Sequence, residues 1–177
     1  MIEPLRGSQG GAGIDNDPIR KLGDAVRAMA HASPNRIALT DGEEARSFGE
    51  LAELLDVPSA AGAPRRAAKV GSSVTDVEAI LRAGFAGESL LLLDASTTAW
   101  ELERAEALFA KGVAASASPP ALGLCSSGSS GLPKVVELEW ESLLSNAASF
   151  AAAAGYGDDD VLWCTTPLAH LYCLGAG

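Results

Sequence analysis

The 177-residue sequence predicts an α/β fold in which mostly parallel strands alternate with helices. Short apolar runs, of which residues 90–93 (LLLL) are the clearest, lie between segments with helical periodicity. Because helices cover both faces of a parallel sheet, its central strands are apolar on both sides, as this run is. Helix-start signals recur along the chain, and alternating strands and helices are typical of α/β layers.

The N-terminal region predicts one helix followed by one strand. Residues 1–16 are Gly-rich, so we expect them to be disordered, with residues 17–177 forming the domain. Asp17-Pro18 is typical of a helix start, and Ser33-Pro34 ends the helical periodicity. Residues 36–40 (RIALT) then predict a short strand, with a turn at 41–42.

Three further helices are predicted by one repeated start signal, a hydroxyl side chain three residues before a glutamate. At that spacing, the hydroxyl and the carboxylate accept hydrogen bonds from each other's free backbone N–H groups. Apolar residues at helical spacing follow each pair. The pairs are Ser47 with Glu50, Thr75 with Glu78, and Thr98 with Glu101.

The C-terminal half predicts strands on both sides of a Ser/Gly-rich run, then a helix and a last strand. Val136, Leu138 and Trp140 recur at the period of a half-buried strand, so we expect all three to face inward. Surface connections are expected at 58–66 and 114–120. The predicted elements are strands at 121–125, 136–140 and 161–166, and a helix at 141–154 that Gly155 ends.

The composition argues against several classes of partner. The net charge of −10 argues against a nucleic-acid surface or an anionic membrane, because both need a basic face. The N-terminus lacks the basic start and following apolar run that would indicate a signal peptide. No apolar stretch approaches the length of a membrane span. We therefore expect a cytoplasmic protein that binds neither nucleic acid nor membrane.

The three cysteines are odd in number and clustered late in the chain, unlike a disulfide framework. We expect Cys125, Cys164 and Cys173 to be buried free thiols in a reducing cytoplasm. Cys164, His170 and Cys173 also have residue types that bind metals. No fourth ligand has convincing spacing, so we expect no metal site.

Residues 126–134 (SSGSSGLPK) have the composition of a linker, but they lie between two predicted strands. Gly128 and Gly131 let the backbone turn tightly and expose consecutive N–H groups, which bind anions such as polyphosphate. Serine hydroxyls and the Lys134 ammonium add donors for phosphate oxygens. The run is not a P-loop, because Pro133 precedes the lysine and a strand follows. The alternative is a surface loop without a ligand.

The order of these residues resembles the phosphate-loop signature of the adenylate-forming superfamily. This superfamily includes acyl- and aryl-CoA synthetases, luciferases and the adenylation domains of peptide synthetases. Val135 stands where the family usually has glycine. Residues 167–175 (PLAHLYCLG) and 34–51 (PNRIALTDGEEARSFGEL) are similar to two further segments of the family. The resemblance covers most of the chain and implies the N-terminal part of the family's AMP-binding domain.

The resemblance implies ATP-dependent activation of a carboxylic acid. The carboxylate attacks the α-phosphate of Mg-ATP, and the acyl group then passes to a thiol of coenzyme A or of a carrier protein. The residues around His170 resemble those of fatty-acyl and aryl-acid enzymes, and His170 would form a wall of the acyl pocket. Lys134 would be the catalytic residue of this part. The implied phosphate-binding residues are Ser126, Ser127, Gly128, Ser129, Ser130, Gly131 and Lys134.

Other parts that the family needs have no counterpart in this sequence. They are a Tyr-Gly-x-Thr-Glu segment for adenine and magnesium, an aspartate for the ribose, and a lysine from a mobile C-terminal domain. We therefore expect the magnesium ligand to lie outside this chain, and we expect the chain alone to be inactive. The alternative is a non-catalytic module, or a split half that works by pairing with a partner chain.

Overall fold

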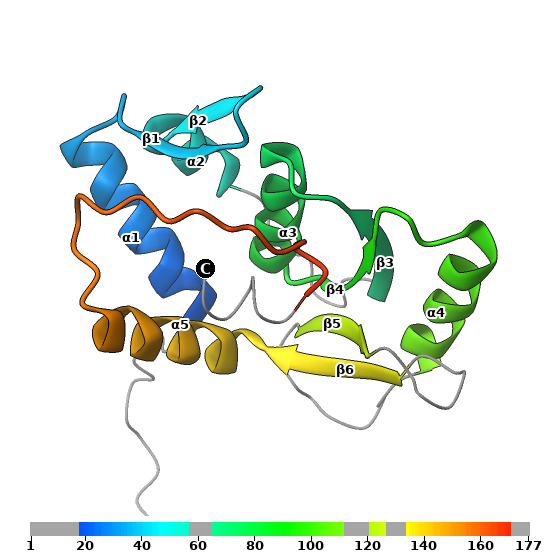
Figure 1. Cartoon of the computed structure of the whole chain (residues 1–177). Coiled ribbons are helices and arrows are strands. Elements are labelled where there is room, and N and C mark those ends of the chain that lie inside the picture. Colours follow the sequence, from blue (N-terminus) through cyan, green and yellow to red (C-terminus); the bar gives the residue numbers. More distant parts are fainter. Residues whose placement is uncertain (1–17, 57–64, 112–120, 127–133, 171–177) are drawn as a thin grey trace, which may run out of the picture.

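The structure is a computed structural model that describes residues 18–56, 65–111, 121–126 and 134–170. These residues form a four-stranded sheet, a separate two-stranded sheet and five helices (Figure 1). In chain order the elements are α1 (Pro18–Ala32), β1 (Ile37–Thr40), β2 (Ala45–Ser47), α2 (Phe48–Leu54), β3 (Arg65–Val70), α3 (Val74–Ala86), β4 (Ser89–Asp94), α4 (Ala99–Lys111), β5 (Ala121–Ser126), β6 (Lys134–Glu139) and α5 (Trp140–Ala154).

The larger sheet has the strand order β3-β4-β5-β6. β3, β4 and β5 are parallel, and β6 returns antiparallel to β5. Strands joined by helices must cross over the sheet, and α3 and α4 make these crossovers. The predicted α/β class with a mostly parallel sheet is confirmed.

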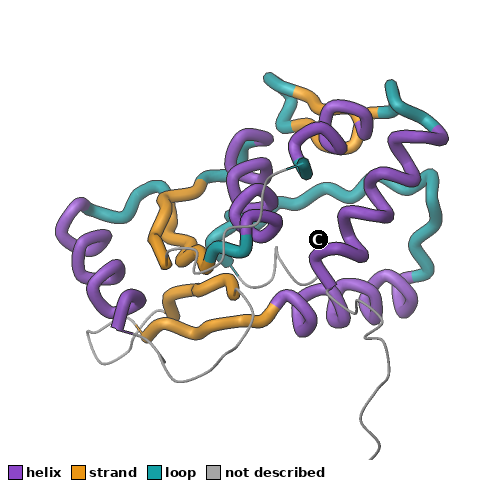
Figure 2. The backbone as a smooth tube through the Cα atoms, turned by 180° about the vertical axis from the view of Figure 1, so that it is seen from behind, coloured by secondary structure: helices purple, strands orange, loops and turns teal. Residues whose placement is uncertain are grey.

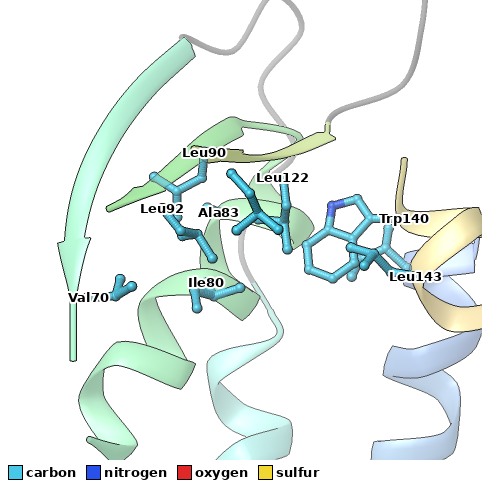
Figure 3. Packing of buried hydrophobic residues seen from close by; sticks show 10 residues of the cluster. Val70, Ile80, Ala83, Leu90, Leu92, Leu122, Trp140 and Leu143 are labelled. Carbon is cyan, nitrogen blue, oxygen red and sulfur yellow. The ribbon is translucent and has the colours of Figure 1, made fainter. Parts of the chain in front are cut away.

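β4 lies at the centre of the core. Leu90, Leu91 and Leu92 have no exposed surface, as the apolar run predicted. Leu90 and Leu92 pack with Ile80 of α3 and Trp140 of α5 on one face of the sheet (Figure 3). On the other face, Leu91 and Leu93 pack with Ala105 and Phe109 of α4. Helices therefore cover both faces of the strand, as its two-sided apolar character requires.

The N-terminal elements form a smaller cluster beside this core. Val26 of α1, Leu51 of α2 and the neighbouring Leu55 are buried together, with Leu81 of α3 packed against them. The predicted strand at 36–40 is confirmed as β1, and it pairs antiparallel with β2, which the sequence analysis did not identify.

Asp41 joins the β1–β2 hairpin to α3. Its Oδ1 accepts hydrogen bonds from the backbone N–H groups of Glu43 and Glu44, at 2.9 and 2.8 Å. Its Oδ2 accepts one from the N–H of Val74 at 2.9 Å, at the start of α3. These backbone hydrogen bonds, led by that of Glu44, lower the pKa of Asp41 to about 2.

Two of the three predicted helix starts are confirmed. Ser47 and Glu50 exchange side-chain-to-backbone hydrogen bonds at the start of α2. At the start of α4, Thr98 and Glu101 do the same, with N–O distances of 2.8 Å to the carboxylate and 3.3 Å to the hydroxyl.

The predicted pair Thr75 and Glu78 is wrong, because α3 begins two residues earlier. Ser73 is the N-cap of α3 and forms the reciprocal pair with Asp76. Glu78 instead binds Arg46 of β2, with Nε and Oε1 2.5 Å apart. A long-range ion pair thus uses the carboxylate that the local spacing had assigned to the cap.

Further differences concern strands. Residues 65–66, predicted as part of a connection, begin β3. The segment 161–166, predicted as a strand, has no strand in the structure. β6 begins at Lys134 and ends at Glu139, so Trp140 is the first residue of α5.

Trp140 and Leu138 face the core as predicted, with Trp140 buried and Leu138 packed against the α3–α5 side. Val136 pairs with Leu124 on that same face, yet its side chain is 47% exposed. The prediction that Val136 faces inward is therefore wrong. β6 is an edge strand, and α5 begins only at its far end.

The described helices include none that is long and apolar enough to cross a membrane. The predicted disorder at 1–16 lies outside the described residues, so it stays a prediction.

A close contact between α3 and α5 yields a first prediction. A Cβ at Gly84 would stand 2.6 Å from Cζ2 of Trp140, whose ring packs against this helix. Gly84→Ala should therefore destabilise the protein by about 1–3 kcal/mol through overpacking, although alanine favours a helix. Urea unfolding measures this. Gly157→Ala is the control, because its Cβ would meet nothing closer than Asp160 Oδ2 at 3.9 Å. A Gly84→Ala protein as stable as the wild type would contradict the contact.

A second prediction follows from the lowered pKa of Asp41, whose ordinary value is 3.8 and whose folded value is about 2. A depressed carboxyl pKa contributes stability that is present above the unfolded pKa and lost as the pH falls through the folded pKa. Between pH 4 and 2, the wild type should therefore lose stability more steeply than Asp41→Asn. Urea unfolding at several pH values measures the slopes. Asp24→Asn, on α1, should keep the wild-type slope, and equal slopes in all three proteins would refute this role of Asp41.

Candidate functional site

The two ends of the Ser/Gly-rich run are neighbours in the sheet. Ser126 ends β5, Lys134 begins β6, and the two residues are antiparallel partners. The run therefore connects two adjacent strands, as the sequence predicted. The side chain of Lys134 is exposed. Ser127, Gly128, Ser129, Ser130 and Gly131 lie outside the described residues.

The connection begins at the carboxyl edge of the parallel strands. The register pairs Leu92 with Leu124, so Asp94 and Ser126, two residues further along, lie at the same end of β4 and β5. Val70, the last residue of β3, pairs with Asp94. In open α/β sheets, ligands bind outside the carboxyl ends of the strands. The two described ends of the run, Ser126 and Lys134, therefore lie at the edge where open α/β sheets bind ligands.

His170 lies at this same edge. It ends a turn in which its N–H donates to the carbonyl of Pro167 at 2.9 Å. The N–H of Leu168, in the same turn, donates to the carbonyl of Gly71 at 3.4 Å, directly after β3. His170 is exposed and lies close enough to Asp94 to influence its ionisation. The structure therefore brings the predicted residues Ser126, Lys134 and His170 to one edge of the sheet.

Asp94 is a residue of this edge that the sequence analysis missed. The hydroxyl and the backbone N–H of Ser96 both donate to its Oδ1, the latter at 2.8 Å. These hydrogen bonds, with a smaller effect from His170, hold the pKa of Asp94 below its ordinary value. The available signal was its position, because an acidic residue directly after the apolar run of a parallel strand lies at the carboxyl edge, where open α/β sheets bind ligands.

The other turns at this edge are occupied by the chain's own carboxylates. Oδ2 of Asp76 accepts hydrogen bonds from the N–H groups of Gly71 and Ser73, at 3.0 and 3.2 Å. Glu101 caps α4 in the same way, and the hydrogen bond from the Thr98 backbone is the main reason that its pKa is lowered. N–H groups at the starts of α3 and α4 therefore already have these anionic partners, and the carboxylate charges would repel an added phosphate there.

An apolar cavity of about 140 Å³ lies behind the site, between α3 and α5. Leu122 of β5, Trp140 and Leu168 are among its lining residues. Leu168 connects this cavity with the site, because it belongs to the turn that carries His170. The lining can contact an apolar group but offers little to a phosphate.

The predictions for Cys125 and Cys164 have different outcomes. Cys125 is a free cysteine, and burial raises the pKa of its thiol. Cys164 is exposed and disulfide-bonded, so the prediction of a buried free thiol is wrong there. Among the described residues, no group of three or more His, Cys, Asp or Glu side chains could hold a metal ion. Cys173 lies outside this part of the chain.

Comparison with known proteins identifies the family. The family model described as AMP-binding enzyme matches residues 59–176, which is more than half of the chain. The chain therefore belongs to the AMP-binding, or adenylate-forming, enzymes, and the predicted resemblance is confirmed. No curated protein sequence matches the chain.

Solved structures of this family share the fold at low sequence identity. o-Succinylbenzoate CoA synthetase (MenE) from Bacillus subtilis, in complex with the acyl-adenylate intermediate OSB-AMP, is 19% identical with a TM-score of 0.62, over 85% of this chain and 51% of that one. The apo structure of MbtA from Mycobacterium smegmatis is 19% identical with a TM-score of 0.64, over 88% and 41%. A long-chain-fatty-acid-CoA ligase (FadD1) from Archaeoglobus fulgidus is 17% identical with a TM-score of 0.62, over 87% and 44%.

The chain thus spans about half the length of these solved relatives. The Bacillus subtilis enzyme has also been solved with ATP and a magnesium ion, and a double mutant of it with the product analogue OSB-NCoA. At this level of identity, the likeness establishes the shared fold.

The proximity of His170 and Asp94 yields a third prediction. Asp94→Asn removes the carboxylate charge but keeps an Oδ1 that can accept the hydrogen bonds from Ser96. The imidazole resonances of His170 should therefore shift in NMR spectra at constant pH. The protein has two histidines, so His31 on α1, away from this edge, is an internal control whose signals should not move. An unmoved His170 signal would show that the two side chains do not interact.

Proposed function

We propose that this chain supplies the ATP phosphate-binding loop of a ligase that adenylates an acyl or aryl carboxylic acid. In that reaction, a carboxylate oxygen forms a bond to the α-phosphorus of ATP, and the bond from this phosphorus to the β-phosphate bridging oxygen breaks. Pyrophosphate leaves, and a thiol of coenzyme A or of a carrier protein then takes the acyl group. The observation that carries the proposal is the position of the SSGSSGLPK run, whose ends stand at the carboxyl edge of the sheet.

The residues of the run have distinct parts in this proposal. Lys134 is exposed at the edge, where its ammonium can neutralise charge on the departing pyrophosphate. The serines and glycines between Ser126 and Lys134 would offer hydroxyl and backbone N–H donors to the β- and γ-phosphates. The N–H groups of Gly71 and Ser73, before α3, and of Thr98, before α4, already donate to Asp76 and Glu101, which favours this run as the phosphate-binding element of the edge.

We assign the carboxylic acid to the side of the site where His170 lies. His170 belongs to the turn that packs Leu168 against the apolar core, so it can form a wall between the phosphates and an apolar acyl group. ATP arrives with magnesium, which shields the phosphate charge when bound. We assign the magnesium ligands to another part of the enzyme, as the resemblance to the family implies.

A direct binding measurement tests the phosphate-binding role in the 177-residue chain. Isothermal titration should show that Lys134→Ala binds ATP about 10- to 100-fold more weakly, because charge-assisted hydrogen bonds contribute about 1.5–3 kcal/mol. Lys21→Ala, an exposed lysine on α1, is the matched control and should bind like the wild type. Equal affinities for all three proteins would overturn the proposal.

Catalysis tests the whole proposal when the chain is mixed with, or fused to, a polypeptide that carries the family's remaining motifs. Pyrophosphate exchange into ATP should then depend on the added carboxylic acid. Gly131→Val should reduce exchange more than Ser129→Ala, because a β-branched side chain resists positive φ and obstructs the phosphate. Exchange that none of these substitutions alters would identify the run as a spacer. Exchange that never appears, although ATP binds, would favour the non-catalytic alternative.

A further inference from the structure

Cys164 and Cys125 differ in their chemical state. Cys164 is exposed and disulfide-bonded, whereas Cys125 is a free cysteine. The chain contains three cysteines, so the count leaves Cys173 as the partner of Cys164. Cys173 lies outside the described residues, and its assignment as the partner follows from this count.

The position of Cys125 agrees with the assignment. Cys125 packs beside Phe109, on the face of the sheet that α4 covers. Leu168, which follows Cys164 closely in the chain, packs on the opposite face with Trp140. Burial also raises the pKa of the Cys125 thiol, so little of the reactive thiolate forms there. Cys125 is therefore poorly placed to exchange with the disulfide.

A disulfide between Cys164 and Cys173 encloses the segment that carries His170. In Figures 1 and 2, the chain after α5 passes α1 and α3 before it reaches this turn. The N–H of Leu168 holds the turn to the carbonyl of Gly71 at 3.4 Å, which is longer than a typical hydrogen bond of this kind. The Leu168 side chain packs against the main core, but His170 is exposed. A covalent link around the turn therefore adds a restraint that its other contacts do not supply.

The disulfide of Cys164 is open to thiol–disulfide exchange. Exchange needs access to a sulfur atom, and exposed disulfides are in general the labile or regulatory ones. In the reduced state the Cys164 thiol has another partner, because its Sγ lies 3.3 Å from the carbonyl oxygen of Thr166. The described structure around Cys164 is therefore compatible with both redox states.

We propose that Cys164 and Cys173 form a site of reversible oxidation that restrains the His170 turn. The oxidant is a low-molecular-weight disulfide such as oxidised glutathione. The Cys164 thiolate attacks it, the S–S bond of glutathione breaks, and one glutathione thiol leaves. The Cys173 thiolate then attacks Sγ of Cys164, and the second glutathione thiol leaves. The two cysteines lose two protons and two electrons, which reduce glutathione disulfide to two thiols.

This site is independent of the proposed function, because its chemistry needs neither a nucleotide nor a carboxylic acid. Oxidation ties the two ends of the segment 164–173 together, so the turn between them opens less often. Reduction leaves the turn to the Leu168 contacts alone. The redox state of the pair thereby controls how firmly His170 is held at the carboxyl edge.

Thiol trapping with iodoacetamide, followed by trypsin and mass spectrometry, tests the pairing in the 177-residue chain. No lysine or arginine follows Lys134, so the tryptic peptide 135–177 contains Cys164 and Cys173 but not Cys125. After excess oxidised glutathione, this peptide should carry no alkyl group and should be lighter by two hydrogen atoms. After excess reduced glutathione, it should carry two alkyl groups.

Two variants separate the steps of the exchange. Cys173→Ser should retain glutathione on Cys164 as a mixed disulfide, because no second thiol is present to displace it. Cys125→Ser is the matched control and should give the wild-type result for peptide 135–177 in both glutathione mixtures.

Hydrogen–deuterium exchange tests the restraint. The amides of Leu168 and His170 should exchange about three- to tenfold more slowly in the oxidised protein than in the reduced one. The variant with both Cys164→Ser and Cys173→Ser should exchange at the reduced rate in both glutathione mixtures. The amides of β4, in the centre of the core, are an internal control and should not respond to glutathione.

The proposal fails if peptide 135–177 keeps two free thiols in excess oxidised glutathione. It also fails if excess reduced glutathione leaves the disulfide closed, because the link would then be a permanent structural one. A link to Cys125 or to a second copy of the chain would refute the pairing. Equal amide exchange of Leu168 and His170 in the two redox states would refute the restraint. None of these measurements involves ATP, so their outcome is separate from that of the ATP-binding experiment.

Discussion

The complete burial of β4 is the constraint on which the rest of this structure depends. Leu90, Leu91 and Leu92 have no exposed surface, so both faces of the strand need a covering layer. α4 covers one face, while α1, α3 and α5 cover the other. Crossover helices connect parallel strands, so β3, β4 and β5 all end at the same edge of the sheet. The carboxyl ends of β3, β4 and β5, around which the candidate site lies, are neighbours for this reason.

Local patterns predicted the parts of the fold that depend on near neighbours. The pairs Ser47–Glu50 and Thr98–Glu101 cap their helices because both partners lie within one turn. The same rule failed at Thr75, because Arg46, distant in sequence, binds Glu78. The sequence analysis did not predict the start of β3, for a similar reason. Its charged start, at residues 65 and 66, is stabilised by Phe109, Glu137 and Glu88, which belong to other elements.

The sequence could suggest which residues belong to the candidate site, but not how these residues are arranged in space. The order of serines, glycines and Lys134 indicated a phosphate loop. The strands predicted on both sides of it indicated that this loop connects two strands. The proximity of His170 to Asp94 depends on the register of β3 and β4 and on the turn that Leu168 fixes at Gly71. This proximity depends on residues from three separate segments of the chain, so no single spacing of residues in the sequence could predict it. Residues 161–166 were predicted as a strand from their own pattern, and the structure shows them exposed instead.

The carboxylates at the carboxyl edge also affect how quickly a charged ligand arrives. Asp94 ends β4, and Asp76 and Glu101 lie near the starts of α3 and α4 at this edge. The whole protein carries a net charge of −10. The long-range field therefore opposes a polyphosphate during diffusion, whereas Lys134 attracts it only at short range. Dissolved salt screens distant charges more than close ones, since the Debye length is about 8 Å at physiological ionic strength. Association of an anionic ligand with this edge should therefore become faster, not slower, as salt is first added.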